Sequence, residues 1–438
     1  SAADDAAGLA MVERMNSQIR GLTMATKNAN DGIALIKTTE NALVEVSGML
    51  QRMRELSVQA ANATNSDTER AFANDEINQL QQEISRVSAN TRYNGTQILN
   101  GSFSAKTLQV GIMSGEDISF SIDTVESSLL GTFVITSPVQ APNGANNTAY
   151  ASTNNGIDGD DITIEGNGNT RTVTIETSET AKSAATKINA VAGATTVFAQ
   201  ARTAALLRSS SSTDLNYTVK INDVETAAFN LSSAGVTDAV TKINAITSST
   251  GVMAAATTDG KVLLTDSNGD DITIENTSTQ TTLFVAALEN DGVTTALSGG
   301  EDNLLASGGT DLTTIAGTIR LTSTEGFTVT QATAVGAGAS FFTDGEVAAT
   351  LSSVSSIAVT TTIGASDALA VIDGALDTVS AMRGSLGTLQ NRLDYAVSNL
   401  MKVTEYTVGA RSRIQDADFA AETSRLAKAQ VLQQAGAS

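Results

Sequence analysis

Three oxygen-bearing side chains near the middle of the chain have the spacing of a calcium-binding loop. Asp266, Asn268 and Asp270 occupy the first, third and fifth positions of such a loop. The sixth position holds Asp271 where an EF-hand loop needs glycine, and the twelfth holds Thr277 where it needs glutamate. A β-turn that leads into a strand explains the same residues, and we prefer that interpretation. We therefore predict no cofactor and no metal, with calcium at this turn as the alternative.

The composition removes most enzymatic chemistry. The 438 residues include no histidine and no cysteine, so Ser-His-Asp, Cys-His and HExxH sites are impossible, as are thiolate metal sites and disulfides. Tryptophan is absent and aromatic residues make up only 4% of the chain, which argues against a large aromatic-lined ligand pocket. A glycosidase with paired carboxylates needs no histidine, but no aromatic-lined cleft is suggested. We therefore predict no catalytic residues, and that the protein is not an enzyme.

The charge of the chain restricts its partners. The formal net charge is −21, whereas binding to nucleic acid requires a basic stripe that meets the phosphates. The same charge argues against an anionic membrane surface, and the sequence has no apolar run of about 18 residues that could span a bilayer. We expect neither nucleic acid nor a membrane among the partners.

Basic side chains of the middle region offer one alternative function, the binding of an acidic glycan. Six of them could cluster against such a polysaccharide: Lys182, Lys187, Arg202, Arg208, Lys220 and Lys242. The protein would then be an adhesin or a cell-surface polysaccharide-binding protein. Against this hypothesis, the region is acidic overall and poor in the aromatic rings on which sugars stack.

Both ends of the chain carry an apolar seven-residue repeat that must be buried by a partner helix. Two series run through the C-terminal end, the first with Ile372, Val379, Leu386, Leu393 and Leu400, and the second with Met382, Leu389, Ala396 and Val403. At the N-terminal end the corresponding series are Ile36, Leu43 and Leu50, and Val46, Met53 and Ala60. Because a stripe of a and d positions needs a facing helix, we expect the two chain ends to pack together.

Local signals place the other elements of the two ends. Residues 1–63 are predicted to form one helix, and a capping box from Ser66 to Glu69 begins a second helix that ends near residue 90. Its predicted buried stripe is Phe72, Ile77, Leu80, Ile84 and Val87. Alternating residues at 107–113 and 117–122 predict a β-hairpin. A last long helix is predicted to begin near Ser366-Asp367 and to run to the chain end.

The middle of the chain contains an internal repeat of about 55 residues. KINA at residues 187–190 recurs at 242–245, and GDDITIE at 159–165 recurs at 269–275, two periods later. Each repeat is predicted to contain strands, a helix near 180–192 or 234–247, and a further strand. The repeats therefore predict small stacked modules, flanked by β segments at 131–136 and 317–331.

Several longer stretches of the two ends match one protein family in the right order. They are ADDAAGLA at residues 3–10, LQRMRELSVQ at 50–59, EINQL at 76–80, YNG at 93–95, LGTLQNRL at 386–393 and RSRIQDADFA at 411–420. Over roughly its first 125 and last 75 residues, the chain closely resembles bacterial flagellin, the subunit of the flagellar filament.

This resemblance agrees with an α+β multi-domain fold. We expect a long antiparallel helical bundle with a β-hairpin, built from both chain ends, and an inserted β-rich domain with internal repeats of about 55 residues. The helical rod domain would comprise residues 1–125 and 362–438. The inserted outer region would comprise residues 126–361, with the repeat modules at about 156–300.

The resemblance also implies a function and partners. It implies a structural subunit of the flagellar filament that serves motility, is secreted and extracellular, contacts other flagellin subunits, and exposes its variable region to solvent. Gln51, Arg52, Leu56 and Glu76 match family positions that resemble a recognition patch for an innate immune receptor. The alternative is a solvated face with ordinary surface ion pairs, each of which stabilises little.

One departure concerns the termini. Flagellins extend further at both ends, with terminal helices that form the inner tube of the filament, whereas this sequence opens and closes inside the family pattern. The resemblance thus implies a truncated chain or a natural relative without these helices, and we expect the chain as given to be a monomer.

Overall fold

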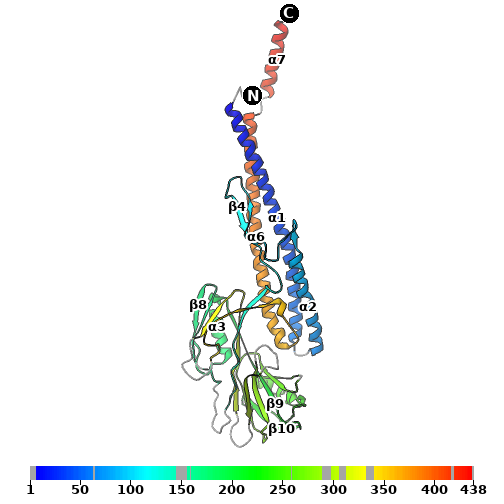
Figure 1. The fold of residues 1–438 in the computed structure, drawn as a ribbon, viewed down its shortest axis with the longest axis vertical. Coiled ribbons are helices and arrows are strands. Elements are labelled where there is room, and N and C mark those ends of the chain that lie inside the picture. The colour runs from blue at the N-terminus through cyan, green and yellow to red at the C-terminus, as the bar shows by residue number, and fades with distance from the viewer. Residues whose placement is uncertain are drawn as a thin grey trace. The chain divides into compact units, whose positions relative to one another are not determined.

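The chain forms two compact units, each assembled from distant parts of the sequence. The first combines Ser1–Ser47, Ser85–Glu126 and Val379–Ser438, and the second combines Gly48–Ile84 and Ser127–Thr378. The structure is a computed structural model, drawn as a ribbon in Figure 1. It describes residues 6–62, 65–144, 155–157, 159–257, 259–288, 297–304, 312–331, 340–415 and 419–436.

The first unit is built on an antiparallel pairing of α1 (Ala6–Ala61) with α6 (Thr362–Gln415), which lie side by side in Figure 1. Three contacts carry this pairing: Arg383 Nε with Glu40 Oε1 at 2.8 Å, Arg411 Nη1 with Asn16 Oδ1 at 2.9 Å, and Leu400 in a buried cluster with Leu22 and Ala25. Residue numbers fall along α1 as they rise along α6. The predicted pairing of the chain ends is confirmed within this unit.

Burial of the heptad positions follows the predicted seams closely. All six N-terminal positions are buried, as are all five members of the series from Ile372 to Leu400. In the second C-terminal series Leu389 is buried, but Val403 is 41% exposed, so the prediction is wrong there. The hydrophobic seam of α6 therefore narrows toward its C-terminal end.

A short β-hairpin packs on α1 in the first unit. It consists of β3 (Lys106–Gln109) and β4 (Asp117–Phe120), which confirms the predicted hairpin with shorter strands. Asn28 Nδ2 donates a hydrogen bond to the carbonyl oxygen of Gln109 at 3.1 Å. The side chain of Leu108 packs directly against the backbone of Gly32. A Cβ atom at Gly32 would lie only 2.5 Å from Leu108 Cδ2, so a larger residue would displace Leu108.

The first unit also holds a tight turn and a second C-terminal helix. The strands β1 (Arg92–Tyr93) and β2 (Thr96–Gln97) pair across Asn94-Gly95, both with positive φ. α7 (Phe419–Gly436) follows α6, and residues 416–418 lie outside the described residues. The structure thus describes two helices, α6 and α7, over the range where one helix was predicted.

The helix α2 (Asp67–Asn90) begins with the predicted capping box. The backbone N–H of Ser66 donates to Glu69 Oε2 at 2.7 Å, and the Glu69 N–H donates to Ser66 Oγ at 3.3 Å. The buried stripe contains Ala73, Ile77 and Ile84, but Phe72 is 69% exposed. The prediction that Phe72 is buried is wrong, because the stripe passes through Ala73, which lies about 100° further round the helix.

The predicted start of the last helix is also wrong by one turn. Helix α6 begins at Thr362, and Thr361 Oγ1 accepts a hydrogen bond from the N–H of Gly364 at 2.9 Å. Asp367 instead lies inside the helix and binds two arginine side chains, those of Arg202 at 3.0 Å and Arg320 at 2.9 Å.

The second unit is mainly antiparallel sheet. Among the described residues, the largest sheet has the strand order β14 (Met253–Ala256), β15 (Val262–Asp266), β9 (Phe198–Ser209), β20 (Thr318–Ser323), β5 (Gly131–Thr136) and β23 (Thr350–Ser353), with β17 (Leu283–Leu288) paired to β9 and β18 (Leu297–Leu304) paired to β17. Its two flanking β segments confirm the strands predicted at 131–136 and 317–331.

Three smaller sheets and several short helices complete the second unit. One sheet has the order β12 (Val224–Glu225), β11 (Val219–Ile221), β16 (Ile272–Asn276), β19 (Leu312–Ile315) and β6 (Asn143–Gly144). Another has the order β22 (Gly345–Ala348), β21 (Thr328–Gln331), β7 (Ile162–Gly166) and β8 (Asn169–Val173). The third pairs β10 (Leu215–Tyr217) with β13 (Phe229–Leu231). The helices are α3 (Ala181–Thr195), α4 (Thr237–Asn244), α5 (Thr247–Thr250) and the 3-10 helix η1 (Val354–Ser356).

The two copies of the KINA motif hold their modules together in the same way. Asn189 Nδ2 donates to the carbonyl oxygen of Ala199 at 2.8 Å, and the Ala199 N–H donates back to Asn189 Oδ1 at 2.8 Å. Asn244 makes the same pair of bonds with Ala254, at 2.9 and 2.7 Å. Each asparagine thus clamps the helix of its module to the following strand.

The turns of the two modules repeat as well. Asn167 and Asn222 follow β7 and β11 and adopt φ values of 51° and 47°, in the left-handed region that asparagine tolerates. Thr196 and Gly251 end the helical segments with φ values of 58° and 76°. The sequence period of about 55 residues is therefore a structural period. Each copy contributes its helix to a separate hydrophobic core, α3 to one and α4 to the other.

Candidate functional site

The patch predicted from the family resemblance lies where α1 and α2 meet in the second unit. Arg52 Nε donates to Glu76 Oε1 at 2.8 Å, and Arg52 Nη1 donates to Glu55 Oε2 at 3.0 Å. Gln51 is exposed, and the Arg52 side chain is half exposed. Leu56, in contrast, is only 4% exposed. The structure therefore brings Arg52 and Glu76 together, leaves Gln51 exposed next to Arg52 in the sequence, and buries Leu56 in the helix packing.

The charge state of this patch follows from its ion pairs. The hydrogen bond from Arg52 to Glu76 raises the pKa of the guanidinium, and the bond to Glu55 adds to this. The guanidinium thus lies between two carboxylates, at 2.8 and 3.0 Å. Because all three side chains are solvated, the pairs contribute to shape and orientation more than to stability.

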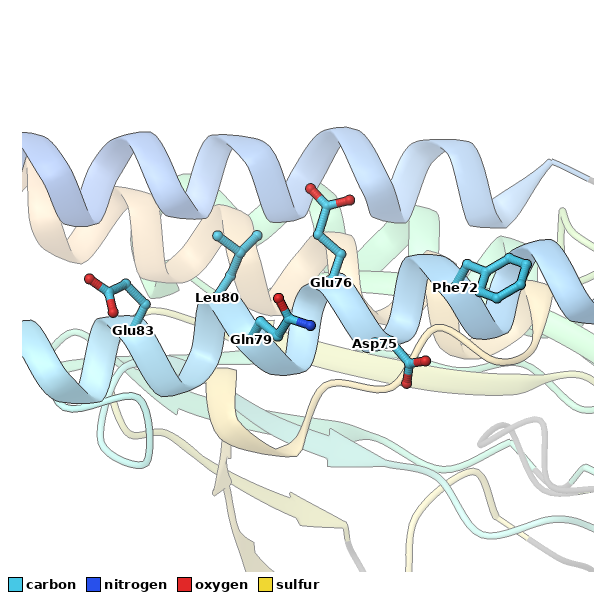
Figure 2. A pocket seen from close by; sticks show the side chains of 6 residues that line it. All are labelled: Phe72, Asp75, Glu76, Gln79, Leu80 and Glu83. Atoms are coloured by element: carbon cyan, nitrogen blue, oxygen red, sulfur yellow. The ribbon is translucent and has the colours of Figure 1, made fainter.

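A hollow of about 700 Å³ runs along the exposed side of α2, next to this patch (Figure 2). Its lining residues are Phe72, Asp75, Glu76, Gln79, Leu80 and Glu83. Figure 2 shows that Glu76 and Leu80 point toward the neighbouring helix. The hollow combines an exposed aromatic ring with three carboxylates, and the sequence does not reveal it because the helical stripe predicts that Phe72 is buried.

The acidic turn considered for calcium is occupied by protein contacts. Asp266 is buried and its Oδ1 accepts a hydrogen bond from the N–H of Asn268 at 2.7 Å, which is the geometry of an Asx-turn. Burial raises the pKa of the Asp266 carboxyl. Asp270 binds the ammonium of Lys182 at 2.6 Å. These contacts favour the β-turn interpretation, and the described residues contain no group of three or more acidic side chains placed to hold a metal.

Most of the basic side chains considered for glycan binding are already paired with carboxylates. Five of the six form ion pairs: Lys182 with Asp270, Lys187 with Glu179, Arg202 with Asp367, Arg208 with Glu301, and Lys220 with Glu275. Lys242, the sixth, has no ion pair among those of the described residues. The pairs are spread over several elements, so they do not form one basic surface.

Comparison with known proteins identifies the family. Residues 1–104 match the family model described as the bacterial flagellin N-terminal helical region, and residues 369–438 match the bacterial flagellin C-terminal helical region. The chain is 36% identical to the B-type flagellin of Pseudomonas aeruginosa over 446 aligned residues, which cover the whole chain and 88% of that relative. The chain belongs to the bacterial flagellins.

Two further comparisons involve other flagellins. The flagellin of Salmonella typhimurium is 32% identical over 481 aligned residues, with the whole chain and 89% of that relative covered. The solved structure of FliC from Burkholderia pseudomallei matches 82% of this chain and 99% of its own, at 18% identity and a TM-score of 0.33.

Family membership confirms several predictions at once. This flagellin is a structural subunit of the extracellular flagellar filament, it assembles with other flagellin subunits, and it belongs to a family of structural proteins rather than enzymes. In the described part of the chain, every helix is too short or too polar to cross a lipid bilayer.

Proposed function

We propose that the paired chain-end helices carry the subunit contacts of the filament, and that the β-rich middle region faces solvent. The observation that carries this proposal is the antiparallel pairing of α1 with α6, sealed by Leu400 against Leu22 and Ala25. Both helices expose long polar faces on the sides away from the seam, and a stiff helical rod can repeat these faces along a polymer.

Filament formation by a strain that expresses the intact gene tests this proposal. Leu400→Asp places a charge in the seam and is expected to abolish filaments, whereas Asn399→Asp adds the same charge one residue away on the exposed side and should preserve them. Normal filaments from Leu400→Asp subunits would contradict the proposal. Electron microscopy of the cells gives the readout, and circular dichroism of the purified chains reports the loss of helix.

We further propose that Gln51, Arg52 and Glu76 form a surface patch that an innate immune receptor can recognise, supported from below by Leu56. The exposed guanidinium of Arg52, which lies between the carboxylates of Glu76 and Glu55, supports this proposal. Arg52→Ala should lower receptor signalling at least tenfold. Arg54→Ala is the matched control, because Arg54 lies on the same helix and forms an ion pair with Asp373 at 2.7 Å. Equal effects of both variants would overturn the proposal.

The binding of an acidic glycan has less support than the role of filament subunit. Five of the six candidate side chains would have to break an ion pair before binding a polysaccharide carboxylate. Calorimetric titration with an acidic polysaccharide tests this alternative, and saturable micromolar binding would restore it.

A further inference from the structure

The outer face of α6 in the first unit carries two tyrosine side chains that almost no protein covers. Tyr395 and Tyr406 are 79% and 75% exposed, whereas Leu393 and Leu400 on the opposite face are buried. Lys402 lies between the two tyrosines on the same face, two turns after Tyr395 and one turn before Tyr406. Aromatic side chains are enriched at protein interfaces, so a stripe of this kind favours a partner.

The second unit offers a surface of the opposite character. The hollow along α2 holds the exposed ring of Phe72 at one end and the carboxylate of Glu83 at the other (Figure 2). Glu76 is paired with Arg52, but among the ion pairs of the described residues none involves Asp75. The hollow can therefore accept aromatic rings and a cation.

We propose that the stripe Tyr395–Lys402–Tyr406 of one chain docks in the α2 hollow of a second copy of the same chain. The inference rests on the proposed filament function and names the two surfaces of one subunit contact. Lys402 would meet the carboxylate of Asp75, while the tyrosine rings would cover Phe72 and Leu80.

The dimensions of the two surfaces agree. The stripe spans residues 395–406 and the hollow spans residues 72–83, which is about 16 Å of helix in each case at 1.5 Å per residue. Two helices can thus lie along one another, with a tyrosine ring at each end of the stripe and Lys402 between the two rings. The tyrosine rings can act as aromatic anchors, and the charge between them can set the register of the two helices.

The contact joins two different surfaces, the stripe of one chain and the hollow of the other. Every pair of chains therefore has one stripe and one hollow that are still unoccupied. One chain of the pair still presents its hollow, and the other still presents its stripe. A contact of this heterologous kind continues without limit unless it closes into a ring, which suits a filament subunit.

Engineered cysteines test the contact directly, because the chain has none of its own. We mix one chain that carries Gln79→Cys with another that carries Lys402→Cys and oxidise the mixture. The disulfide-linked heterodimer should exceed by at least tenfold the product of Gln79→Cys mixed with Thr170→Cys, a control at an exposed position on β8. Adding Phe72→Ala to the Gln79→Cys chain should reduce the heterodimer to the control level, while circular dichroism stays unchanged.

Three outcomes would overturn the inference. The first is a heterodimer yield equal to the control. The second is an unchanged yield with Phe72→Ala combined with weaker signalling through an innate receptor, which would assign the hollow to the receptor. The third separates the inference from the proposed function: filaments of normal number and length from intact subunits with Tyr395→Ala and Tyr406→Ala would remove this contact, yet leave the chain a filament subunit.

Discussion

Among the acidic side chains that the structure describes, Asp271 is the one whose ionisation the fold disturbs most clearly. Burial outweighs the hydrogen bonds that the carboxylate accepts from Asn155 and from the backbone of Gly317, and the pKa rises from 3.8 to about 6. Asp271 ends the acidic turn that was considered for calcium. The turn is therefore packed so that the carboxyl group of Asp271 is buried, and this burial makes its ionisation less favourable.

The free energy of unfolding should depend on pH through this residue. An acid with a raised pKa binds more protons in the folded chain than in the unfolded chain between about pH 4 and pH 6, so stability falls as pH rises through that window. Asp271→Asn removes the penalty and should stabilise the second unit at pH 8 by up to about 3 kcal/mol, with no gain near pH 4. Urea denaturation at several pH values measures this. Asp161→Asn, at the equivalent exposed position of the first repeat, should follow the wild-type curve, and a gain at pH 8 that persists at pH 4 would contradict the assignment.

The asparagine clamps predict equal effects in the two repeats. Asn244→Ala leaves the N–H and the carbonyl oxygen of Ala254 without their side-chain partner and should destabilise the second unit by about 1–3 kcal/mol. Asn189→Ala should cost a similar amount through Ala199. Because the clamps belong to separate cores, the double variant should lose the sum of the two. A double variant no less stable than either single variant would show that the clamps are coupled.

At the scale of elements, local patterns predicted more than long-range pairings. The heptad seams, the capping box and the repeat were predictable because their signals lie within one helix, one turn or two similar segments. The exposure of Phe72 was not predictable, since Ala73 completes the same helical stripe and a small side chain gives a weak signal. The pairing of Arg52 with Glu76 depends on the register of α1 against α2, which neither helix encodes alone. Likewise, no local signal pairs β9 with β20 across more than a hundred residues.

The contact between the hairpin and α1 gives a prediction at this scale. Gly32→Ala places a methyl group against Leu108 and Leu393, and should destabilise the first unit by about 1–3 kcal/mol through crowding. Gly387→Ala is the matched control, because Gly387 lies in α6 of the same unit with open space around it. That variant should stabilise the unit by about 0.5–1 kcal/mol, since alanine favours helix interiors over glycine. Thermal unfolding distinguishes the two, and stabilisation by both would show that the hairpin does not need the space at Gly32.

At the scale of the whole molecule, each unit has its own tie between the chain-end helices and the rest. In the second unit this tie is Asp367 of α6, which binds Arg202 of β9 and Arg320 of β20 in a largely buried cluster. In the first unit the seam itself joins α1 to α6. Leu50 and Leu393, which both belong to the predicted bundle, fall in different units, because antiparallel helices pair low residue numbers with high ones.

The buried cluster predicts a large cost for a small change. Asp367→Asn keeps the shape but removes the negative charge that faces two arginine side chains, each less than one tenth exposed. We expect a loss of about 3–5 kcal/mol in the second unit. Asp373→Asn, on the same helix, removes only the solvated pair with Arg54 and should cost less than about 1 kcal/mol. Chemical denaturation of both variants measures the difference, and similar losses would mean that burial does not set the strength of these pairs.

The bond between Asn16 and Arg411 joins residues that are 395 positions apart in the sequence. A tandem duplication in the middle of the chain changes neither residue, because it only lengthens the sequence between them. The two asparagine clamps fit such a duplication, since each copy has its own helix, its own turn and its own pair of hydrogen bonds from an asparagine. A chain of this kind can therefore gain or lose whole modules of its middle region while the residues that pair α1 with α6 stay the same.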